Sequence, residues 1–596
     1  MGAAAALPLQ KLSLLSQSER QALPWARQRQ LESVLKGQAL VDGWEVDLRV
    51  GLSARFPLVL PQVQWVAGGP EGQVPHLEFD QNLCFAQSEG LLIDGACPQA
   101  VIVQALEQAQ ETLRRGWLEP QYAEFLEEFG AYWGQTQREA LPVLHSFFTP
   151  GEKVLELLAW EERDLHTSPE RRKQVRSVQF RRVATDVGSV RRYDGRAPRN
   201  PSHTALYIPL ASWAQLRPPA PNRPWTGGEL RDLVRSQLDS EVLNQLDGLL
   251  EQRHRTQDLM VLRIPRSGGQ GTLVAVQLKG LGLHPHPLSG GAEPYRLERL
   301  TLHPMRVERL DPDFIRARGG GPTGLGEKRV LLVGAGSVGG HLAFMLASAG
   351  IGHLTVIDSD TFSPHNTFRH ALGRRAVGKR KATALAAELE ATYPYLEASP
   401  EVAWLDEALD RKAPPFRLEN FDLVISATGE STAELDLSAR LRRLPQPERP
   451  AALYTWLEPL GIGGHCAVTL PDQPGCLRCL YAEATGLRGE WLSLHNRAAF
   501  YAPGQSFARD TVGCGTAYTP FADLDARRTA ELAAETALEV FRGRVLASEV
   551  RSWKGDASSF QSAGFKLAPR HTLSTEQLRQ GMSLIDWNCP VCRGMP

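Results

Sequence analysis

The chain has 596 residues, of which 42% are hydrophobic and 22% charged, and its formal net charge is −1. This composition is that of an ordinary globular protein, and the length exceeds one hydrophobic core, so we expect several domains. The absence of long runs of one charge sign argues against nucleic-acid binding. Without eighteen consecutive apolar residues or a basic, apolar secretion signal, we expect a cytoplasmic protein and no membrane partner.

The first 145 residues predict one α+β domain. Residues 11–36 favour a helix rich in Leu, Gln and Arg, and residues 39–65 alternate as strands do. Helical patterns follow over residues 98–116 and then to about Trp133. The sum of these elements has the usual size of a domain.

Residues 146–320 show strand-like segments at 205–210, 259–264 and 272–278, joined by polar and proline-rich connections. No chemical motif is found among them. We therefore expect a second α+β domain with a connecting or docking role.

From residue 321 to residue 596 strands and helices alternate. Strands are predicted at 329–333, 354–358 and 423–427, with helices at 341–349 and 379–393. Such alternation is typical of α/β proteins with a parallel, doubly wound sheet.

A glycine motif, Gly334-Ala-Gly336-Ser-Val-Gly339, follows the first of these strands and opens the first helix. Such glycines let the backbone approach a phosphate, and the helix N-terminus supplies N–H donors. Asp358 ends the next strand, where a carboxylate can accept a ribose hydroxyl. These features alone fit a nicotinamide or flavin enzyme as well as an ATP enzyme.

Three further residues favour ATP. Asn366 and Arg369 follow Asp358 closely, and Lys381 opens the next helix. A triphosphate attacked at its α-phosphorus needs cations because charge builds on the phosphoryl oxygens and on the leaving pyrophosphate. A dinucleotide is already held by the glycine turn, so a redox enzyme is the less favoured alternative.

With these motifs, residues 329–596 resemble the MoeB/ThiF/ubiquitin-activating superfamily, whose members adenylate a carboxylate. The resemblance implies that Asp358 binds the ribose and that Asn366, Arg369 and Lys381 address the phosphates of ATP. The superfamily usually has a magnesium-binding aspartate after the third strand, but residues 426–430 of this chain, Ser-Ala-Thr-Gly-Glu, contain none. Mg²⁺ is then bound by Glu430, by Asp436 or mostly by the phosphates.

The eight cysteines are too few and too scattered for a disulfide scaffold. Four form two Cys-x-x-Cys pairs, which predict a closed, tetrahedral, structural Zn²⁺ site like that of the superfamily: Cys476, Cys479, Cys589 and Cys592. Cys514 lies in a glycine-bracketed loop before a helix that is predicted to begin near Leu524. Related activating enzymes have their acceptor cysteine in this loop, and a helix N-terminus favours the thiolate. We therefore expect Cys514 to be the first acceptor thiol, and Cys466, in an apolar strand, to be a packing residue.

The segment Pro75-His76 to Leu83-Cys84, placed after the strands and before the helices, resembles the ubiquitin-conjugating fold of divergent bacterial proteins. The resemblance implies that Cys84 is a transfer thiol. The usual His-Pro-Asn is missing, so no asparagine can be assigned as oxyanion donor. His76 either orients the loop or the thioester, or only caps a turn, and the alternative for the whole domain is docking without catalysis.

An activating and a conjugating domain on one chain resemble the fusion proteins of bacterial antiphage CBASS operons. The resemblance implies adenylation of a partner's C-terminal tail, thioesters on Cys514 and then Cys84, transfer to a protein amine, and a homodimer. The partner is then a cyclic-nucleotide synthase or a ubiquitin-like protein. A sulfur-carrier adenylyltransferase, which does not need Cys84, and an ATP-binding scaffold remain alternatives.

Overall fold

The computed structural model of the chain describes residues 11–70, 73–87, 90–118, 122–137, 140–163, 179–195, 203–220, 222–251, 259–279, 288, 300–320, 322, 324–412, 416–483, 494–507 and 519–592. Two compact units are present. The first comprises Met1–Val187 and Pro198–Asp311, and the second comprises Gly188–Ala197 and Pro312–Pro596. Each unit is described by itself.

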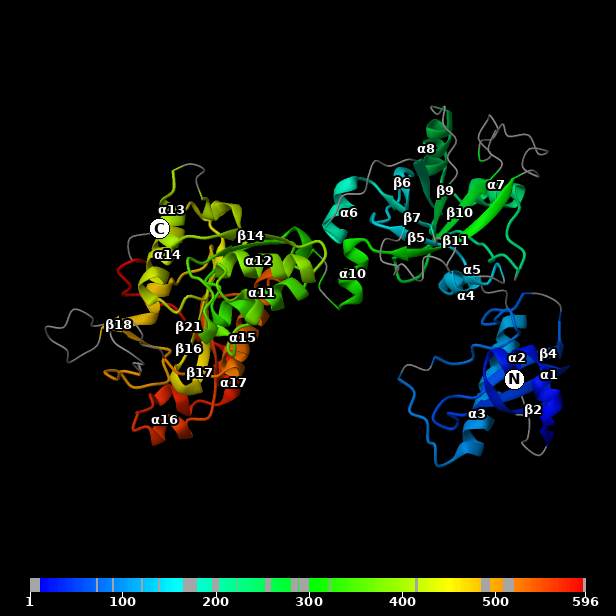
Figure 1. Ribbon diagram of the computed structural model, residues 1–596, viewed down its shortest axis with the longest axis horizontal. Coiled ribbons are helices and arrows are strands. Elements are labelled where there is room, and N and C mark those ends of the chain that lie inside the picture. The colour runs from blue at the N-terminus through cyan, green and yellow to red at the C-terminus, as the bar shows by residue number, and fades with distance from the viewer. Residues whose placement is uncertain are drawn as a thin grey trace. The chain divides into compact units, whose positions relative to one another are not determined.

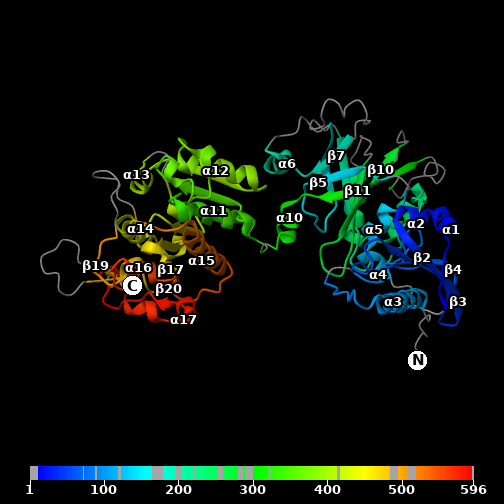
Figure 2. The same ribbon diagram turned by 60° about the horizontal axis from the view of Figure 1, so that its bottom comes forward.

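The first unit begins with a four-stranded antiparallel sheet in the order β1-β2-β3-β4. The strands are β1 (Ser13–Leu14), β2 (Leu31–Val41), β3 (Trp44–Ser53) and β4 (Gln62–Gly68). Helix α3 (Pro98–Leu118) runs beside this sheet in both views (Figures 1 and 2). Alternate residues of β3 and residues on one face of α3 share one core: Val46, Leu48, Val50, Leu106, Ala109 and Leu113. The strand and helix predictions for 39–65 and 98–116 are confirmed.

The single helix predicted over residues 11–36 is wrong. Two short helices, α1 (Gln17–Ala22) and α2 (Pro24–Gln28), are followed by β2, which begins at Leu31. Leu23 has extended backbone angles because a residue before proline avoids the helical region, so α1 ends there. Pairing of β2 with β3 then outweighs the local helix propensity. The second predicted helix is likewise divided, into α4 (Tyr122–Glu127) and α5 (Phe129–Gly134).

The rest of the first unit is a closed barrel in the order β10-β11-β5-β7-β6-β8-β9. The predicted strand segments at 205–210, 259–264 and 272–278 are confirmed as β8, β9 and β10. The seven strands are β5 (Val143–Ser146), β6 (Leu155–Arg163), β7 (Gln179–Ala184), β8 (His203–Pro209), β9 (Leu259–Ile264), β10 (Thr272–Lys279) and β11 (Thr301–Arg309). Every residue of β9 is buried, because one face packs in the barrel interior and the other beneath helices α7 (Gly227–Ser236) and α8 (Ser240–Glu251).

The second unit contains an eight-stranded sheet in the order β14-β13-β12-β15-β16-β17-β20-β21. The strands are β12 (Arg329–Val333), β13 (His353–Ile357), β14 (Glu397–Glu401), β15 (Leu423–Ser426), β16 (Ala451–Leu457), β17 (Gly463–Thr469), β20 (Glu549–Lys554) and β21 (Met582–Ser583). Pairing is parallel from β14 to β16 and antiparallel beyond. The strands β12, β13 and β14 are added in one direction across the sheet, and β15 and β16 are added in the other direction, on the far side of β12. Ligands bind at the carboxyl ends of the strands at such a switch in strand order.

Helices cover both faces of this sheet, as a doubly wound fold requires (Figures 1 and 2). Helices α11 (Ser337–Ser348), α12 (Lys381–Thr392) and α15 (Asp523–Phe541) share one core with the sheet. On the other face lie α13 (Leu405–Asp410) and α14 (Ser431–Arg443). Smaller helices complete the two units: α6 (Val187–Asp194), α10 (Pro312–Arg318), α16 (Ser558–Ser562) and α17 (Thr575–Gln580). Within the described ranges, no helix is long and apolar enough to cross a membrane.

Candidate functional site

The turn between β12 and α11 needs glycine at two of its three glycine positions. Gly334 has φ 96°, a left-handed conformation that favours glycine. A Cβ on Gly339 would lie 1.9 Å from the carbonyl oxygen of Gly334, so only glycine lets α11 pack this close to the turn. A Cβ on Gly336, the N-cap of α11, would meet nothing within 4 Å.

Gly336 lines a cavity of about 910 Å³ at the carboxyl ends of β12 and β15. Besides the glycine turn, the cavity is lined by the first residues of α11 and α14, by the loop after β15, by the end of β16 and by the segment before α15. Among these residues are Ser337, Thr428, Glu434, Glu458 and Phe521. A cavity of this size, at the point where the strand order reverses, can hold a nucleotide together with the end of a peptide.

Asp358, predicted to bind ribose, follows β13 and is bound to the turn. One carboxylate oxygen accepts from the backbone N–H of Ala335 at 2.7 Å, and the other from the N–H of Asp360 at 2.8 Å. Burial raises the pKa of Asp358, and these two hydrogen bonds oppose that rise. The carboxylate therefore fixes the shape of the glycine turn, whatever it also offers to a ribose.

The predicted phosphate residues lie after β13 and at the start of α12. Nζ of Lys381 is 2.7 Å from the carboxylate of Asp360. Oδ1 of Asn366 accepts from the N–H and the hydroxyl of Ser363, at 2.9 and 3.1 Å.

Arg369 lies with its guanidinium carbon 5.0 Å from the centre of the Phe521 ring, and Phe521 is one of the residues that line the cavity. Its Nε atom is buried, and no described residue accepts a hydrogen bond from it. The Nε–H of Arg369 thus has no acceptor among the described residues.

His370 was not predicted as a site residue from the sequence. Its Nδ1 accepts from the N–H of Leu372 at 3.0 Å, so Nε2 carries the proton and donates to the carbonyl oxygen of Ala335 at 2.7 Å. Burial lowers the pKa of His370, which keeps the ring neutral in this role. His370 thus binds the carbonyl oxygen of Ala335, and Asp358 binds its N–H. Its only sequence signal was its position next to Arg369.

Glu434 is a second residue that sequence analysis missed. It is 3% exposed and accepts from the hydroxyls of Ser426 and Thr428 at 3.0 and 3.2 Å. Burial raises its pKa to about 7. Of the two carboxylates considered for Mg²⁺, Glu430 is exposed at the N-cap of α14 and Asp436 is paired with Arg440 at 2.6 Å, whereas Glu434 lines the cavity.

The two Cys-x-x-Cys pairs meet in space. The four sulfur atoms of Cys476, Cys479, Cys589 and Cys592 lie within 4.8 Å of one another. Individual separations are 3.9 Å (Cys476 to Cys479), 3.8 Å (Cys476 to Cys589), 3.6 Å (Cys479 to Cys592) and 3.4 Å (Cys476 to Cys592). Four thiolates at a Zn–S distance of about 2.3 Å in a tetrahedron are about 3.8 Å apart. The donor set and its spacing therefore fit a zinc ion.

Cys84 lies in the loop between β4 and α3 and is exposed. Its N–H donates to the carbonyl oxygen of His76 at 2.8 Å, and its thiol donates to Oε1 of Glu78 at 3.3 Å. Partial burial of the thiol, followed by the charge of Glu78, raises the pKa of Cys84 to about 12.

The side chain of His76 contacts acidic residues near α4 and α5 (Nδ1 to Glu128 at 3.0 Å, Nε2 to Glu124 at 3.7 Å). The hydrogen bond that the ring of His76 donates to the carboxylate of Glu128 raises the pKa of His76. Its backbone N–H donates to the hydroxyl of Tyr132 at 2.6 Å. His76 has φ 62°, so the loop before Cys84 turns sharply at this residue. These contacts hold the loop before Cys84 in place, and the predicted role of His76 in catalysis stays a prediction.

Cys514 lies outside the described residues, so its predicted role keeps its basis in the sequence alone. Helix α15 begins at Asp523, close to the predicted start at Leu524. Cys466, in β17, is fully buried, which confirms the prediction of a packing residue.

The sequence of this chain matches two protein families and is similar to several known proteins. Residues 315–507 match the ThiF family, and residues 17–142 match prokaryotic E2 family B. The ATP-dependent ubiquitin transferase-like protein Cap2 of Vibrio cholerae is 30% identical over 242 residues, 39% of each chain. Cap2 of Escherichia coli strain TW11681 is 23% identical over 326 residues, 52% of this chain and 53% of that protein.

The molybdopterin-synthase adenylyltransferase of Escherichia coli K12 is 32% identical over 162 residues, which are 27% of this chain and 61% of the relative. The matches to the two Cap2 proteins thus span between about two fifths and half of those relatives. The resemblance inferred from the motifs is confirmed: this chain carries a ThiF-family domain and a prokaryotic E2 family B domain.

Proposed function

We propose that this protein activates the C-terminal carboxylate of a partner protein with ATP and conjugates it to a target amine, in bacterial antiphage defence. One observation carries the proposal: a single chain combines a ThiF-family domain that has a phosphate-type glycine turn with an E2-family domain that presents an exposed cysteine. Adenylation alone needs no E2-family domain, and an E2-family domain alone has no source of activated acyl groups.

In the first step a carboxylate oxygen of the partner's tail attacks the α-phosphorus of ATP, and pyrophosphate leaves. We propose that Asp358 binds the ribose. The glycine turn lets the backbone approach the phosphates, and further side chains bind them. The turn consists of Gly334, Gly336 and Gly339, and the phosphate-binding side chains are those of Asn366, Arg369 and Lys381. The unpartnered, buried Nε of Arg369 supports this assignment, since a phosphate oxygen is a strong acceptor.

In the next steps the acyl group moves between sulfur atoms. The thiolate of Cys514 displaces AMP to form a thioester, and Cys84 then accepts the acyl group from Cys514. An amine of the target attacks the Cys84 thioester, which yields an amide and releases the thiol. Each transfer preserves most of the activation because one thioester replaces another.

Two metal ions belong to the proposal. Zn²⁺ is held by the four-cysteine cluster, where four thiolates leave no open position, so its role is structural. Mg²⁺ accompanies ATP and neutralises charge on the phosphates.

We further propose three domains with boundaries near residues 145 and 320. We also propose that the protein is a cytoplasmic homodimer and that its partner presents an exposed C-terminal tail. The barrel of residues 146–320 has the connecting or docking role. The partner is a cyclic-nucleotide synthase or a ubiquitin-like protein.

A sulfur-carrier adenylyltransferase is the second candidate, and the 32% identity to the molybdopterin-synthase enzyme favours it. Such an enzyme would use the same adenylation site but would not need Cys84. Wild type, Cys84→Ala and Cys514→Ala are compared after incubation with ATP, Mg²⁺ and partner proteins encoded beside the gene, by non-reducing gel and mass spectrometry. A thiol-sensitive adduct on Cys84 that is lost in Cys514→Ala supports conjugation. An adenylated partner without any adduct on Cys84 supports the second candidate.

A further inference from the structure

The side chain of Glu78 contacts the thiol of Cys84. The thiol donates to Oε1 of Glu78 at 3.3 Å, and the amide of Asn82 donates to the same oxygen at 3.4 Å. Glu78 and Cys84 lie on the two sides of a tight turn, in which the N–H of Glu78 donates to the carbonyl oxygen of Asn82 at 2.9 Å. The backbone of the turn therefore brings residues 78 and 84 close together.

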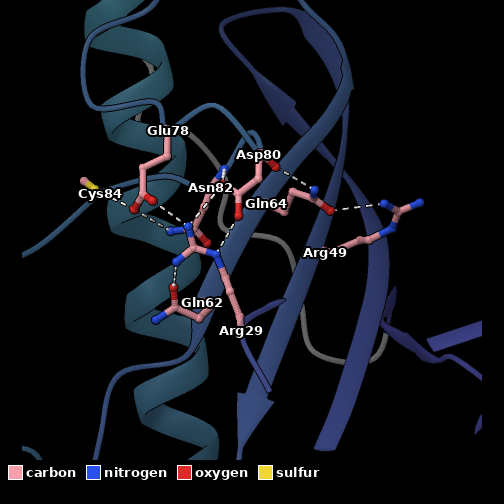
Figure 3. A network of polar contacts seen from close by, with 8 residues as sticks. All are labelled: Arg29, Arg49, Gln62, Gln64, Glu78, Asp80, Asn82 and Cys84. Atoms are coloured by element: carbon pink, nitrogen blue, oxygen red, sulfur yellow. Dashed lines mark hydrogen bonds and ion pairs between the residues drawn. The ribbon is translucent and has the colours of Figure 1, made fainter. Parts of the chain in front are cut away.

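Arg29 holds the other oxygen of Glu78. Its Nη2 donates to Oε2 of Glu78 at 2.6 Å, and its Nε lies 2.8 Å from the carboxylate of Asp80. Its Nη1 donates to Gln62 at 2.9 Å. Figure 3 shows the guanidinium between Glu78, Asp80 and Gln62, with Cys84 on the far side of Glu78.

The two oxygens of the Glu78 carboxylate thus have different partners. Arg29 occupies Oε2 and fixes the orientation, so Oε1 points to the sulfur (Figure 3). A negative charge beside the sulfur disfavours a free thiolate, which agrees with the direction of the pKa shift of Cys84. A thiol that is seldom ionised needs a base at the moment of attack, and a carboxylate within hydrogen-bond distance can serve as one.

We propose that Glu78 carries the thiol proton during acyl transfer to Cys84, with Arg29 as a positioning residue. As the sulfur bonds to the acyl carbon of the incoming thioester, its proton moves to Oε1 of Glu78. The carbon–sulfur bond of the donor then breaks, and the same proton passes to the departing sulfur. One thioester and one thiol are consumed, and one of each is formed, so atoms and protons balance.

The role of Cys84 as acceptor rests on the proposed function, but the proton transfer can be tested without the partner protein. The full chain is treated with S-acetylglutathione, an alkyl thioester, and separately with iodoacetamide, which reacts with thiolate and needs no base. Peptide mapping by mass spectrometry gives the rate at Cys84. Cys97, which is also exposed, is an internal reference in the same maps.

Glu78→Gln keeps the shape and removes the base. We expect iodoacetamide to alkylate Cys84 of this variant about tenfold faster than in wild type at pH 8, because the negative charge that disfavours the thiolate is removed. We also expect acetyl transfer to Cys84 at pH 7 to be at least about tenfold slower, because general-base catalysis is lost. Acetyl transfer in the variant should rise about tenfold per pH unit, as thiolate does, and in wild type much less steeply.

Glu111→Gln is the matched control, since Glu111 is a glutamate of the same domain that pairs with Arg114 at 2.6 Å. It should leave both rates at Cys84 unchanged. Rates that both increase in Glu78→Gln, or that both stay at the wild-type value, would overturn the proposal. Opposite changes at Cys84 with constant rates at Cys97 would support it, and a purely structural role cannot produce them. Failure of the partner relay would leave these rates unaffected, so the two hypotheses are separable.

Discussion

The buried carboxylate of Glu434 makes the second unit sensitive to pH. Its pKa is raised from 4.5 to about 7 because burial disfavours the charged form. The neutral form is thus stabilised in the folded state, so this stability is complete below pH 4.5 and is lost as the pH rises towards 7. The shift corresponds to about 3 kcal/mol once the group is ionised in both states. Most of that difference, about 2 kcal/mol, develops between pH 5 and pH 8.

Glu434→Gln removes the charge and keeps acceptors for the hydroxyls of Ser426 and Thr428. We expect the unfolding temperature of the variant, minus that of wild type, to increase by about 5 °C between pH 5 and pH 8. Differential scanning calorimetry of the full chain measures both proteins, and the transition of the second unit is identified as the one that ATP raises.

A constant difference between the two proteins across this pH range would refute the reasoning, since it would mean that Glu434 does not titrate there. Glu430→Gln is the control. Glu430 is exposed, and its charge is the last of the causes that act on the pKa of Glu434, so its variant should keep most of the pH dependence of wild type.

Three further variants test the site. Gly339→Ala places a Cβ 1.9 Å from the carbonyl oxygen of Gly334. We expect the unfolding free energy, measured by denaturation, to fall by about 2 kcal/mol. We also expect the variant to lose binding to a non-hydrolysable ATP analogue, measured by calorimetry. Cys589→Ser should lower the zinc content from about one ion per chain to well below half, measured by plasma mass spectrometry; unchanged zinc would contradict the four-thiolate site. His370→Ala removes the hydrogen bond to Ala335 and should weaken binding of the same analogue about tenfold by calorimetry, whereas unaltered affinity would exclude a role in shaping the turn.

The sequence predicts best where periodicity and glycine constraints act locally. The strands β12, β13 and β15 lie within one residue of their predicted bounds, because buried parallel strands are short apolar runs flanked by turn signals. The glycine turn was also predictable, since Gly334 has a left-handed conformation and a Cβ on Gly339 would clash with the carbonyl oxygen of Gly334. The meeting of the four cysteines followed from the chemistry of Cys-x-x-Cys pairs.

Features that depend on distant partners were not predictable. Residues 31–36 favoured a helix but form the start of β2, because the partner strand β3 decides their conformation. The closed barrel could not be derived from three strand segments, since closure depends on pairings between strands far apart in sequence. Glu78 and Glu434 carried no motif, and only the fold brings the first to the sulfur of Cys84 and buries the second beside the cavity.

The most direct test of the central claim is to follow one acyl group from sulfur to sulfur on this chain. Protein is charged with a partner, ATP and Mg²⁺, ATP is removed, and the adduct is located by peptide mapping at short intervals. We predict an adduct that appears first on Cys514 and then on Cys84 at the expense of the first, and that stays on Cys514 in Cys84→Ala. An adduct that never reaches Cys84, while AMP and pyrophosphate are still released, would contradict the account.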